Sequence, residues 1–390
     1  MLILAFLLFS CLALRTTLVV SMTLSQSVTL RDRLASNKFP MLSQSVTLRD
    51  RLVIDKFPIF TLGALGLGKR ITDGPTFKES VSLNGQTIVI TGANSGLGKE
   101  AAIKLASLDA KKVIILCRNP VAAAAAITEI DERSKTKGLV STIPLDLGDL
   151  KSIEKCVAQL KSEVGNIDVL MNNAGVMAIP TRETTEDGFE RQIGINHLGH
   201  YALTLSLLKS GLIKSSSSGG TARIINVSSV AHQMGNLEKV RDDLFLEKPK
   251  AYTPWGAYGN SKLANVLFTR ELARRLSDSS RSESDSRIAT FTLHPGVCRT
   301  ELYRYLTDIP KILYPLVGAV ALPAIYLTKS AKQGAQTQIF LAASNKINPA
   351  ADSGKYFDNS REVSTSKAAQ NMETASWLWQ ESARLTGINL

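Results

Sequence analysis

The chain has few of the features that would indicate a metalloprotein, a disulfide-rich fold or a nucleic-acid-binding protein. Its four cysteines are scattered along the sequence, at Cys11, Cys117, Cys156 and Cys298. Because metal sites and disulfide frameworks need closer spacings, we expect free thiols and no structural metal. The net charge is +12 at pH 7, yet no basic run with interleaved aromatic residues occurs, which argues against nucleic acid as a partner. The positive charge better suits an anionic cofactor or a membrane surface.

Long hydrophobic runs are also scarce, and the most prominent one lies at the amino terminus. Residues 1–13 are almost wholly apolar, Arg15 interrupts the run, and residues 18–22 continue it. This length suits a signal or anchor segment and is marginal for a membrane span. No Lys or Arg precedes the run, so the sequence does not orient it. We expect residues 1–22 to direct the protein to the endoplasmic reticulum membrane, with a plastid or another organelle as the alternative.

Residues 23–75 form an extension of low complexity. The sequence LSQSVTLRDRL occurs twice, at residues 24–34 and 42–52, and therefore repeats with a period of 18 residues. Two copies are too few to build a solenoid. Each copy carries Ser, Thr and Arg and is weakly amphipathic, which suits a transit or membrane-surface segment and equally a duplication without function.

In residues 76–390, β-branched runs alternate with helical periodicity. The predicted strands are residues 87–91, 113–117, a third that ends over 142–147, 167–171, 222–227, 287–293 and 354–357. Alternation at this spacing predicts an α/β fold, a doubly wound parallel sheet with helices on both faces and a single catalytic domain. Ligands of such sheets bind at the carboxyl ends of the strands, which is where the motifs below stand.

Three glycines mark the turn after the first predicted strand. Gly92, Gly96 and Gly98 stand in the pattern TGANSGLG, and residues 99–108 then show helical periodicity. Glycine is needed where the chain turns tightly, where the backbone approaches a pyrophosphate and where a helix packs on a strand. The start of the following helix offers free N–H groups to phosphates. A strand before and a helix after the turn favour nucleotide binding over an ordinary glycine-rich turn.

Tyr258 and Lys262 stand four residues apart at the start of an apolar helical run, so they share one face of a helix. A nearby ammonium favours the phenolate, which lets a tyrosine exchange a proton with a carbonyl or an alcohol near neutral pH. Alone, such a pair is more often a packed ring beside a solvated amine. Together with a phosphate-binding turn, it predicts hydride-transfer chemistry.

In kind and in order, these motifs resemble those of the short-chain dehydrogenase/reductase family, over roughly residues 84–385. The matching positions are Thr91, Gly92, Gly96, Gly98, Asp146, Leu147, Asn172, Asn173, Ala174, Gly175, Asn196, Ser228, Ser229, Tyr258, Lys262, Pro295 and Gly296. Residues 196–200, 226–232, 261–265, 294–297, 333–337 and 353–357 look like the retinol-dehydrogenase-like branch. The resemblance implies a Rossmann fold and a nicotinamide cofactor.

The resemblance also implies four catalytic residues, Asn196, Ser229, Tyr258 and Lys262. Tyr258 would be the general acid/base, and Lys262 would lower its pKa and hold the nicotinamide ribose. Ser229 would bind the substrate oxygen as charge develops there, and Asn196 would hold a water that links Lys262 to solvent. Each has a plainer alternative, because Asn196 could satisfy backbone groups and Ser229 could simply end a strand.

The implied cofactor-binding residues are Gly92, Asn94, Ser95, Gly96, Leu97, Gly98, Arg118, Asp146, Leu147, Asn173, Ala174, Gly175, Tyr258, Lys262, Pro295, Gly296, Val297 and Thr300. Asp146 would bond the adenine edge, or alternatively cap a helix. Residues 173–175 would pass beneath the adenine ribose, and residues 295–297 with Thr300 would lie along the nicotinamide. Arg118 follows the second strand with no carboxylate beside it, and a guanidinium there suits a 2′-phosphate. We therefore expect NADP(H); the alternative is a surface arginine.

Residues 312–327 carry no charge and are broken by Pro315 and Pro323. They stand where this family places its substrate-covering segment, so we expect an apolar lid that touches a membrane surface; the alternative is a core helix with a proline bend. The predicted function is NADP(H)-dependent interconversion of an apolar aldehyde or ketone (retinoid-, steroid- or lipid-like) and its alcohol. The alternatives are a non-catalytic NADP-binding redox sensor or scaffold and a protochlorophyllide-reductase-like enzyme. The sequence is compatible with a homo-oligomer.

Overall fold

One sheet organises the part of the chain that the structure describes. The structure is a computed structural model that describes residues 69, 72–214, 220–277, 287–298 and 328–390. The strands are β1 (Thr87–Thr91), β2 (Lys112–Cys117), β3 (Val140–Pro144), β4 (Val169–Asn172), β5 (Ala222–Val227), β6 (Ile288–His294), β7 (Tyr356–Asp358) and β8 (Arg361–Glu362). Their order is β3-β2-β1-β4-β5-β6-β7-β8, and only β7 and β8 pair antiparallel. The predicted doubly wound α/β fold is confirmed.

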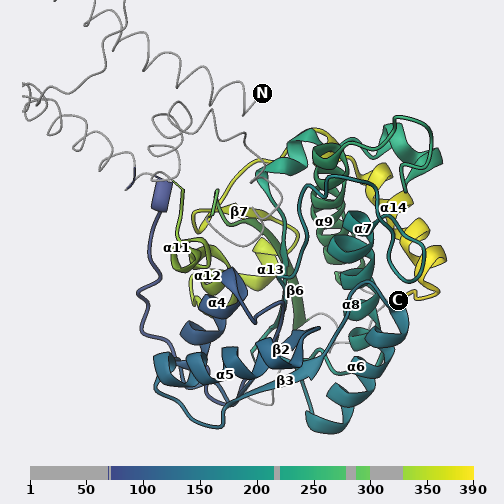
Figure 1. The fold of residues 1–390 in the computed structure, drawn as a ribbon. Helices are drawn as coiled ribbons and strands as arrows, with labels where there is room; N and C mark the ends of the chain where they lie inside the picture. Colours follow the sequence, from purple (N-terminus) through teal and green to yellow (C-terminus); the bar gives the residue numbers. More distant parts are fainter. Residues whose placement is uncertain (1–68, 70–71, 215–219, 278–286, 299–327) are drawn as a thin grey trace, which may run out of the picture. The chain divides into compact units, whose positions relative to one another are not determined.

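Helices connect these strands (Figure 1). They are α4 (Gly96–Ala106), α5 (Pro120–Ser134), α6 (Leu150–Glu163), α7 (Arg191–Ile193), α8 (Gly199–Lys209), α9 (Pro254–Leu276), α11 (Ala331–Gly334), α12 (Gln336–Ala343), α13 (Pro349–Asp352) and α14 (Met372–Thr386). A π-turn, η1 (Gly194–Leu198), joins α7 to α8, and the 3₁₀ turns are η2 (Val230–Met234), η3 (Glu238–Asp243) and η7 (Ala368–Gln370). Asn119 and Thr253 cap α5 and α9, each of which has a proline in its first turn.

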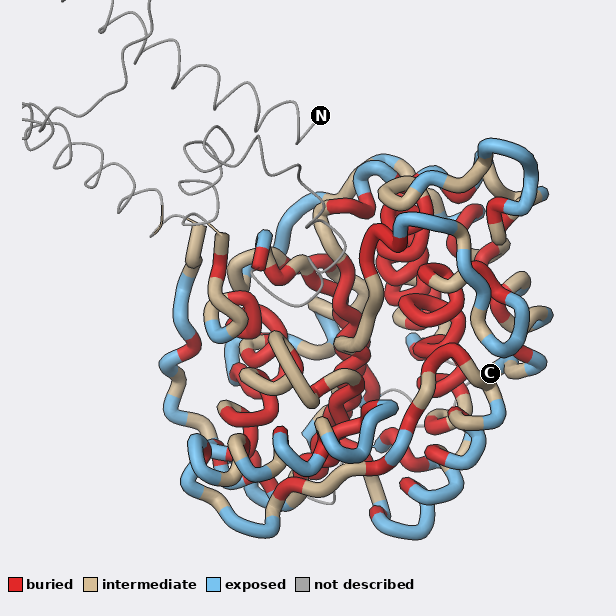
Figure 2. The backbone as a smooth tube through the Cα atoms, in the orientation of Figure 1, coloured by how far each residue is buried: buried red, intermediate tan, exposed pale blue. Residues whose placement is uncertain are grey.

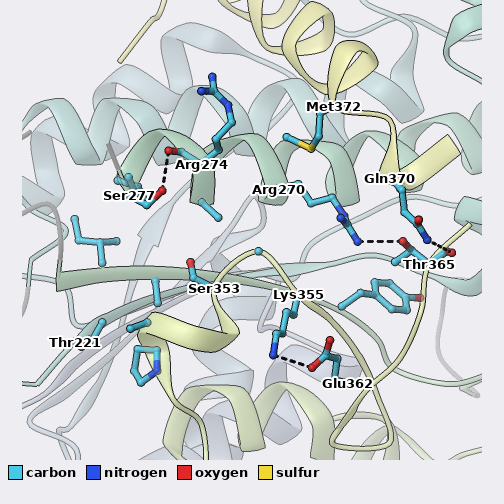
Figure 3. Close-up of a pocket in the computed structure, with 18 of the residues that line it drawn as sticks. Thr221, Arg270, Arg274, Ser277, Ser353, Lys355, Glu362, Thr365, Gln370 and Met372 are labelled. Carbon is cyan, nitrogen blue, oxygen red and sulfur yellow. Dashed lines mark hydrogen bonds and ion pairs between the residues drawn. The ribbon is translucent and has the colours of Figure 1, made fainter. Parts of the chain in front are cut away.

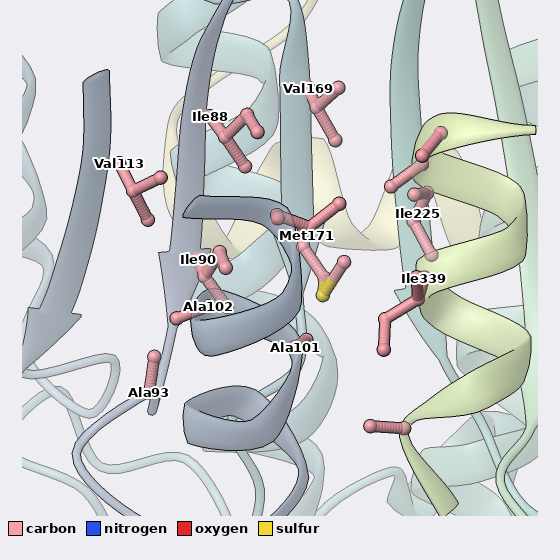
Figure 4. Packing of buried hydrophobic residues seen from close by; sticks show 14 of the residues in the cluster. Ile88, Ile90, Ala93, Ala101, Ala102, Val113, Val169, Met171, Ile225 and Ile339 are labelled. Atoms are coloured by element: carbon pink, nitrogen blue, oxygen red, sulfur yellow. The ribbon is translucent and has the colours of Figure 1, made fainter. Parts of the chain in front are cut away.

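The helices cover both faces of the sheet, and the side chains of β1 alternate between them. Ile88 and Ile90 share a core with α4, α5 and α12, whereas Val89 belongs to the core formed with α6, α8 and α9. Figure 4 shows the first core, where the small side chains of Ala101 and Ala102 on α4 face β1. The central strands β1, β4, β5 and β6 are almost wholly buried, while the outer faces of the helices are exposed (Figure 2). Burial on both faces explains why these strands are continuous apolar runs.

Several strand ends differ from the prediction by one to three residues, including those of β3 and β4. β3 ends at Pro144, so residues 145–147 follow the strand instead of belonging to it. β4 begins at Val169, although the backbone of Asp168 still bonds both neighbouring strands, donating to the Thr87 carbonyl at 2.9 Å and accepting from the N–H of Arg223 at 2.8 Å. In both places the apolar run is longer than the strand, since residues beside a strand end are buried as well.

The edge strand β8 was not predicted. It pairs with β7 through a tight turn in which Asn359 and Ser360 both have positive φ angles, 50° and 58°. Two consecutive residues of this kind produce a turn whose twist suits a hairpin. Because neither is glycine, the sequence carried no strong signal for it.

Several predicted features lie outside the described residues. These are the hydrophobic segment 1–22, both copies of the repeat, Thr300 and the apolar segment 312–327. In the described ranges, no helix combines the length and the apolar character that crossing a membrane requires.

Candidate active site

The glycine-rich turn after β1 packs directly on the segment after β4. Gly92 has φ +65°, and a Cβ there would lie 2.9 Å from both the Cα and the Cβ of Ala174. A Cβ on Gly98 would lie 2.5 Å from Nδ2 of Asn173, which donates to the Thr91 carbonyl at 2.9 Å. The two glycines therefore permit a close approach that any side chain would block.

A cavity of about 270 Å³ adjoins this turn, at the carboxyl ends of β1, β2 and β4. The predicted cofactor-binding residues that line it are Gly92, Asn94, Ser95, Gly96, Leu97, Arg118, Asp146, Leu147, Asn173, Ala174 and Gly175. Residues that line it without having been predicted are Leu116, Cys117, Asn119, Leu145, Val176 and Ile195. Each of these residues lies one or two positions from a predicted site residue in the sequence. Closeness to the motifs could therefore have identified them.

The start of α4 opens on the cavity. Ser95, the N-cap residue of α4, makes no side-chain capping bond, so its hydroxyl does not occupy the first N–H groups of the helix. Free helix N–H groups beside a cavity bordered by glycine are what a pyrophosphate needs. The residues present therefore fit the phosphates of a dinucleotide.

Arg118 and Asp146 line the same cavity from the ends of β2 and β3. Their side chains are 55% and 39% exposed, and Nη1 of Arg118 lies 3.9 Å from Oδ2 of Asp146. An ion pair this long and this exposed is weak, so the guanidinium remains available to an anion. The alternative role of Asp146 as a helix cap is wrong, because Asp149 caps α6 by accepting from the backbone N–H of Lys151 at 2.9 Å.

Tyr258 and Lys262 lie in the first half of α9, and both side chains are buried. The Lys262 ammonium donates to the Val227 carbonyl, at the end of β5, at 3.0 Å, and lies 5.7 Å from the centroid of the Tyr258 ring. Burial lowers the pKa of Lys262 to about 8, because desolvation disfavours the charged form. The structure thus brings the predicted pair together, with a lysine that is still charged at neutral pH.

Asn196 lies in the π-turn η1 and is completely buried. Its Oδ1 accepts from the backbone N–H of Val176 at 2.8 Å, and its Nδ2 donates to the Val176 carbonyl and to Oγ of Ser261, both at 2.9 Å. Both amide hydrogens are therefore used, and the side chain satisfies the backbone as the plainer alternative expects. The water-holding role stays a prediction. A Cβ on Gly175 would lie 3.0 Å from Oδ1 of Asn196 and 3.5 Å from Nζ of Lys262, so both groups border this glycine.

Two serines follow β5 and have different surroundings. Oγ of Ser228 is buried and donates to the backbone carbonyl of Lys262 at 2.7 Å. Ser229 is only partly buried, and its Oγ accepts from the backbone N–H of Ala231 at 3.1 Å. Ser228 therefore ties α9 to the sheet, while the hydroxyl hydrogen of Ser229 is not used in its capping bond and can point to a substrate oxygen.

Apolar side chains surround Tyr258. Met177, Ala178 and Ala231 pack with it in a separate small cluster. The ring of Trp255 meets it edge-on, with centroids 6.1 Å apart and planes at 81°. The surroundings of the predicted acid/base are therefore suited to an apolar molecule.

The turn after β6 carries residues 295–297 and packs on a buried lysine. Gly296 has φ +87°, and a Cβ there would lie 2.6 Å from Cε of Lys329. The backbone N–H of Lys329 donates to the Val297 carbonyl at 2.8 Å, and Cys298 and Lys329 form a parallel bridge. Residues 295–297 are thus fixed beside the end of β6, although they do not line the 270 Å³ cavity.

A larger cavity of about 810 Å³ lies at the other end of the sheet, where β6 and β7 begin. Figure 3 shows its polar side chains bonded to one another: Arg270 donates to Thr365, and Lys355 pairs with Glu362. None of the predicted site residues in the described ranges lines this cavity. Cavity size therefore does not locate the predicted site.

In the part of the chain that the structure describes, no group of three or more His, Cys, Asp or Glu side chains could hold a metal ion. Cys117, Cys156 and Cys298 are free and buried. Burial raises the pKa of Cys156 and of Cys298 to about 12, so these two thiols are unreactive at neutral pH.

Comparison with known proteins identifies relatives over most of the chain. Residues 86–240 match the family model of short chain dehydrogenases. Human retinol dehydrogenase 12 is 40% identical over 315 residues, which cover 81% of this chain and 90% of that protein. Human retinol dehydrogenase 13 is 40% identical over 329 residues, which cover 84% of this chain and 92% of that protein.

Solved structures share the fold. An uncharacterized protein from Mycobacterium paratuberculosis has a TM-score of 0.60 at 33% identity and covers 81% of this chain and 98% of its own. A short chain dehydrogenase from Shigella flexneri 2a, complexed with NADP, has a TM-score of 0.53 at 20% identity and covers 73% of this chain and 100% of its own. At that identity the likeness concerns the fold alone.

Proposed function

Because the chain belongs to the short-chain dehydrogenase/reductase family, in its retinol-dehydrogenase-like branch, we propose that it interconverts an apolar aldehyde or ketone and its alcohol with NADP(H). Family membership makes it an oxidoreductase that acts on CH–OH groups with a nicotinamide cofactor. The observation that carries the finer proposal is the placement of Tyr258 and Lys262. They lie on one helix with the Lys262 ammonium near the Tyr258 ring, and Lys262 lies against the end of β5 and beside Gly175, which lines the smaller cavity.

Arg118 supports the choice of NADP(H) over NAD(H). It lines the cavity where the second strand ends, and its only ion pair in the described residues is the loose contact with Asp146. A 2′-phosphate would meet a planar guanidinium that gives two parallel hydrogen bonds. The α5 N-terminus follows at once, with Asn119 as its cap, so its positive end favours the same anion.

The bound nicotinamide would supply the hydride for the carbonyl carbon, or accept it in the reverse direction. In reduction, the Tyr258 hydroxyl would give its proton to the carbonyl oxygen and be left as a phenolate. The charged Lys262 nearby stabilises that phenolate, and Ser229 would donate its free hydroxyl hydrogen to the same substrate oxygen. Asn196 would hold the water through which the proton on Tyr258 is replaced. In oxidation, the Tyr258 phenolate would accept the proton of the alcohol, and Ser229 would bond the same substrate oxygen.

An apolar substrate is supported by the side chains around Tyr258 and by two exposed ones. Met234, at the end of η2, is 52% exposed, and Val297, in the turn after β6, is 46% exposed. Both follow closely on segments that carry site residues. Exposed apolar side chains close in the sequence to catalytic groups suit a lipid-like molecule or a covering segment, and we propose residues 312–327 as that cover. Retinoids enter as candidates because the similar human proteins are named retinol dehydrogenases.

A substrate panel tests the proposal. The full-length protein with NADPH is offered retinaldehyde, a steroid ketone, a long-chain aldehyde and a small polar aldehyde, and consumption of NADPH is followed by absorbance. We expect turnover of the apolar carbonyls with kcat/KM at least about tenfold above that of the polar one. Binding of NADPH with no turnover of any carbonyl would instead favour a sensor or scaffold.

Membrane association is a separate part of the proposal and rests on residues 1–22 and 312–327. A chain that begins at Lys69 keeps the contacts of Lys69 and Asp73 with Gln333 and lacks the first hydrophobic segment. We expect the full-length chain to sediment with membranes, and the shorter one to keep weaker binding that charged residues at Leu316 and Val320 remove. A full-length chain found wholly in the supernatant would refute this part and leave the chemistry untouched.

A further inference from the structure

His200, the second residue of α8, is buried and bonds on both sides of its ring. Its Nδ1 lies 3.0 Å from the backbone carbonyl oxygen of Asn196, and its Nε2 lies 2.9 Å from Oγ1 of Thr91. A carbonyl oxygen only accepts hydrogen bonds, so Nδ1 must carry a hydrogen. One ring thus joins the π-turn that holds Asn196 to the residue just before the glycine-rich turn.

The bonds of Thr91 determine the state of the other nitrogen. Oγ1 of Thr91 accepts from the backbone N–H groups of Asn173 and Ala174, both at 2.9 Å. A hydroxyl has two lone pairs and one hydrogen, so this hydrogen must point to a further acceptor. The two candidates are Nε2 of His200 at 2.9 Å and the Met171 carbonyl at 3.4 Å. The shorter contact is a normal hydrogen bond and the longer one is weak, so Nε2 accepts.

The surroundings also keep this ring neutral. A second proton would sit on Nε2 and face the Thr91 oxygen, whose lone pairs are already taken. Burial, together with a smaller effect of the charge of Lys262, lowers the pKa of His200 to about 4. The other titratable neighbour is His197, whose pKa burial lowers to about 3, so it brings no charge near neutral pH. The ring therefore holds one hydrogen, on Nδ1, in the pH range where most histidines titrate.

We propose that His200 is a positioning residue: as its neutral Nδ1–H tautomer it fixes the Asn196 turn to Thr91 and, through Thr91, to the loop of Asn173 and Ala174. In this series of hydrogen bonds the donor and the acceptor of each bond are fixed. No residue in it can rotate its side chain without breaking the hydrogen bond to the next residue. The loop at its far end lines the cofactor cavity, while the turn at its near end holds Asn196 beside Lys262. The cofactor side and the proton-transfer side of the site are thereby held in one fixed relation.

The tautomer is tested first, by ¹⁵N NMR of the imidazole nitrogens in the full-length protein labelled at histidine. The chain has four histidines, and the spectrum of His200→Asn assigns the signals of His200. We expect a protonated Nδ1 and an unprotonated Nε2 that do not change from about pH 5.5 to about pH 8. A hydrogen on Nε2, or a titration inside that range, would overturn the proposal. This readout needs no turnover, so it is independent of the proposed function.

A double-mutant cycle then tests whether His200 acts through Thr91. Thr91→Val and His200→Phe should each lower kcat by about tenfold, with the KM for the carbonyl substrate little changed. Because both break the same chain, the double variant should be about as slow as the slower single one. Thr91→Ser keeps the hydroxyl and should restore most of the rate. A double variant slower by about 100-fold, the product of the two, would show independent roles and refute the coupling.

His197 supplies the matched control. It is as buried as His200 and only three residues away, but its Nε2 bonds Oγ of Ser382 on α14, at 2.9 Å, away from the cavity residues. His197→Phe should lower the melting temperature while kcat stays within about twofold of the native value. If His197→Phe slowed turnover as much as His200→Phe at equal loss of stability, the effect of His200 would be one of packing alone.

Discussion

The two cavities lie at opposite ends of the same sheet and are built in opposite ways. The smaller one, at the carboxyl ends of β1, β2 and β4, is bordered by glycines, by backbone N–H groups of α4 and by the lone exposed pair of Arg118 and Asp146. The lining of the larger one, where β6 and β7 begin, includes the long charged side chains of Arg270, Arg274, Lys355 and Glu362. In it, Lys355 pairs with both Asp352 and Glu362.

The difference shows which features make a cavity a binding site. Backbone donors held by glycine turns lose no side-chain freedom when a ligand arrives, so their bonds to it cost little entropy. Charged side chains that already bond each other would have to exchange partners, and the gain from such an exchange is small. Volume favours the larger cavity, while preorganisation favours the smaller one. Variants at corresponding positions of the two ends test this distinction.

The largest effect is expected from Tyr258→Phe. Loss of the hydroxyl removes the proton donor and keeps the ring, so kcat should fall by about 1,000-fold or more. The affinity for NADPH, measured by quenching of protein fluorescence, should stay within about threefold. Turnover near the native rate would refute the assignment of the acid/base to this residue.

A glycine pair compares the two ends directly. Gly92→Ala puts a methyl group against Ala174 at a φ of +65° and should weaken NADPH binding by about 30-fold or more. Gly354→Ala, beside the larger cavity, has a similar φ of +85° with Ala273 3.1 Å from the new Cβ. It should lower the melting temperature while NADPH affinity stays within about twofold. Equal losses of affinity in the two variants would erase the distinction between the ends.

Arginines give a second comparison, with an expected effect of about tenfold. Arg118→Asp should shift the ratio of kcat/KM for NADPH and NADH toward NADH, because a carboxylate repels the 2′-phosphate and can accept from ribose hydroxyls. Arg270→Gln in the larger cavity removes a bond to Thr365 and should leave that ratio unchanged. If Arg118→Asp left the ratio of kcat/KM for NADPH and NADH unchanged, the 2′-phosphate would have to bind elsewhere.

The smallest effect is one on stability, and it concerns the buried charge of Lys262. Its pKa is about 8 in the folded protein and 10.5 ordinarily, so between these pH values the unfolded chain binds more protons than the folded one. The free energy of unfolding of the cofactor-free protein should therefore gain from this group as pH rises from 8 to 10.5, and the cost of burial is fully present below pH 8. Lys262→Met should remove this dependence and stabilise the protein at pH 7 by about 1–2 kcal/mol while abolishing turnover. Denaturant titrations at several pH values measure it. A variant less stable than the native protein would mean that the bond to Val227 outweighs desolvation.

Much of the fold could be predicted because its signals are local. β1 and β5 coincide with their β-branched runs, and α5 begins at the proline that marks its first turn. The edge strand β8 escaped prediction because it depends on Asn359 and Ser360 adopting positive φ, which their identities permit without requiring. The π-turn escaped for a similar reason, since one extra residue in a turn leaves the apolar periodicity almost unchanged.

The sequence predicts which residues form the site better than it predicts the hydrogen bonds between them. Glycine spacing and the Tyr–Lys pair indicate which side chains meet, because the glycine turn follows β1 and the helix that carries the pair packs on the end of β5. The role of His200 could not be predicted this way: it depends on Thr91, Asn173 and Asn196 converging from different segments with hydrogen bonds in particular directions. Which atom donates and which accepts in these hydrogen bonds depends on how the segments meet in three dimensions, and the sequence of one segment does not show it.

The bridge between Cys298 and Lys329 has a consequence for how this chain can diverge from its relatives. It joins the two ends of the stretch from residue 299 to residue 328 by backbone pairing that does not involve the stretch itself. The entropy of closing a loop changes by only about 0.6 kcal/mol for each doubling of its length. Insertions, deletions or replacement of residues between Cys298 and Lys329 should thus leave the positions of β6 and α11 unchanged. Under the proposal that residues 312–327 cover the substrate, variation in this stretch would change substrate preference without altering the residues of the cavity at β1, β2 and β4.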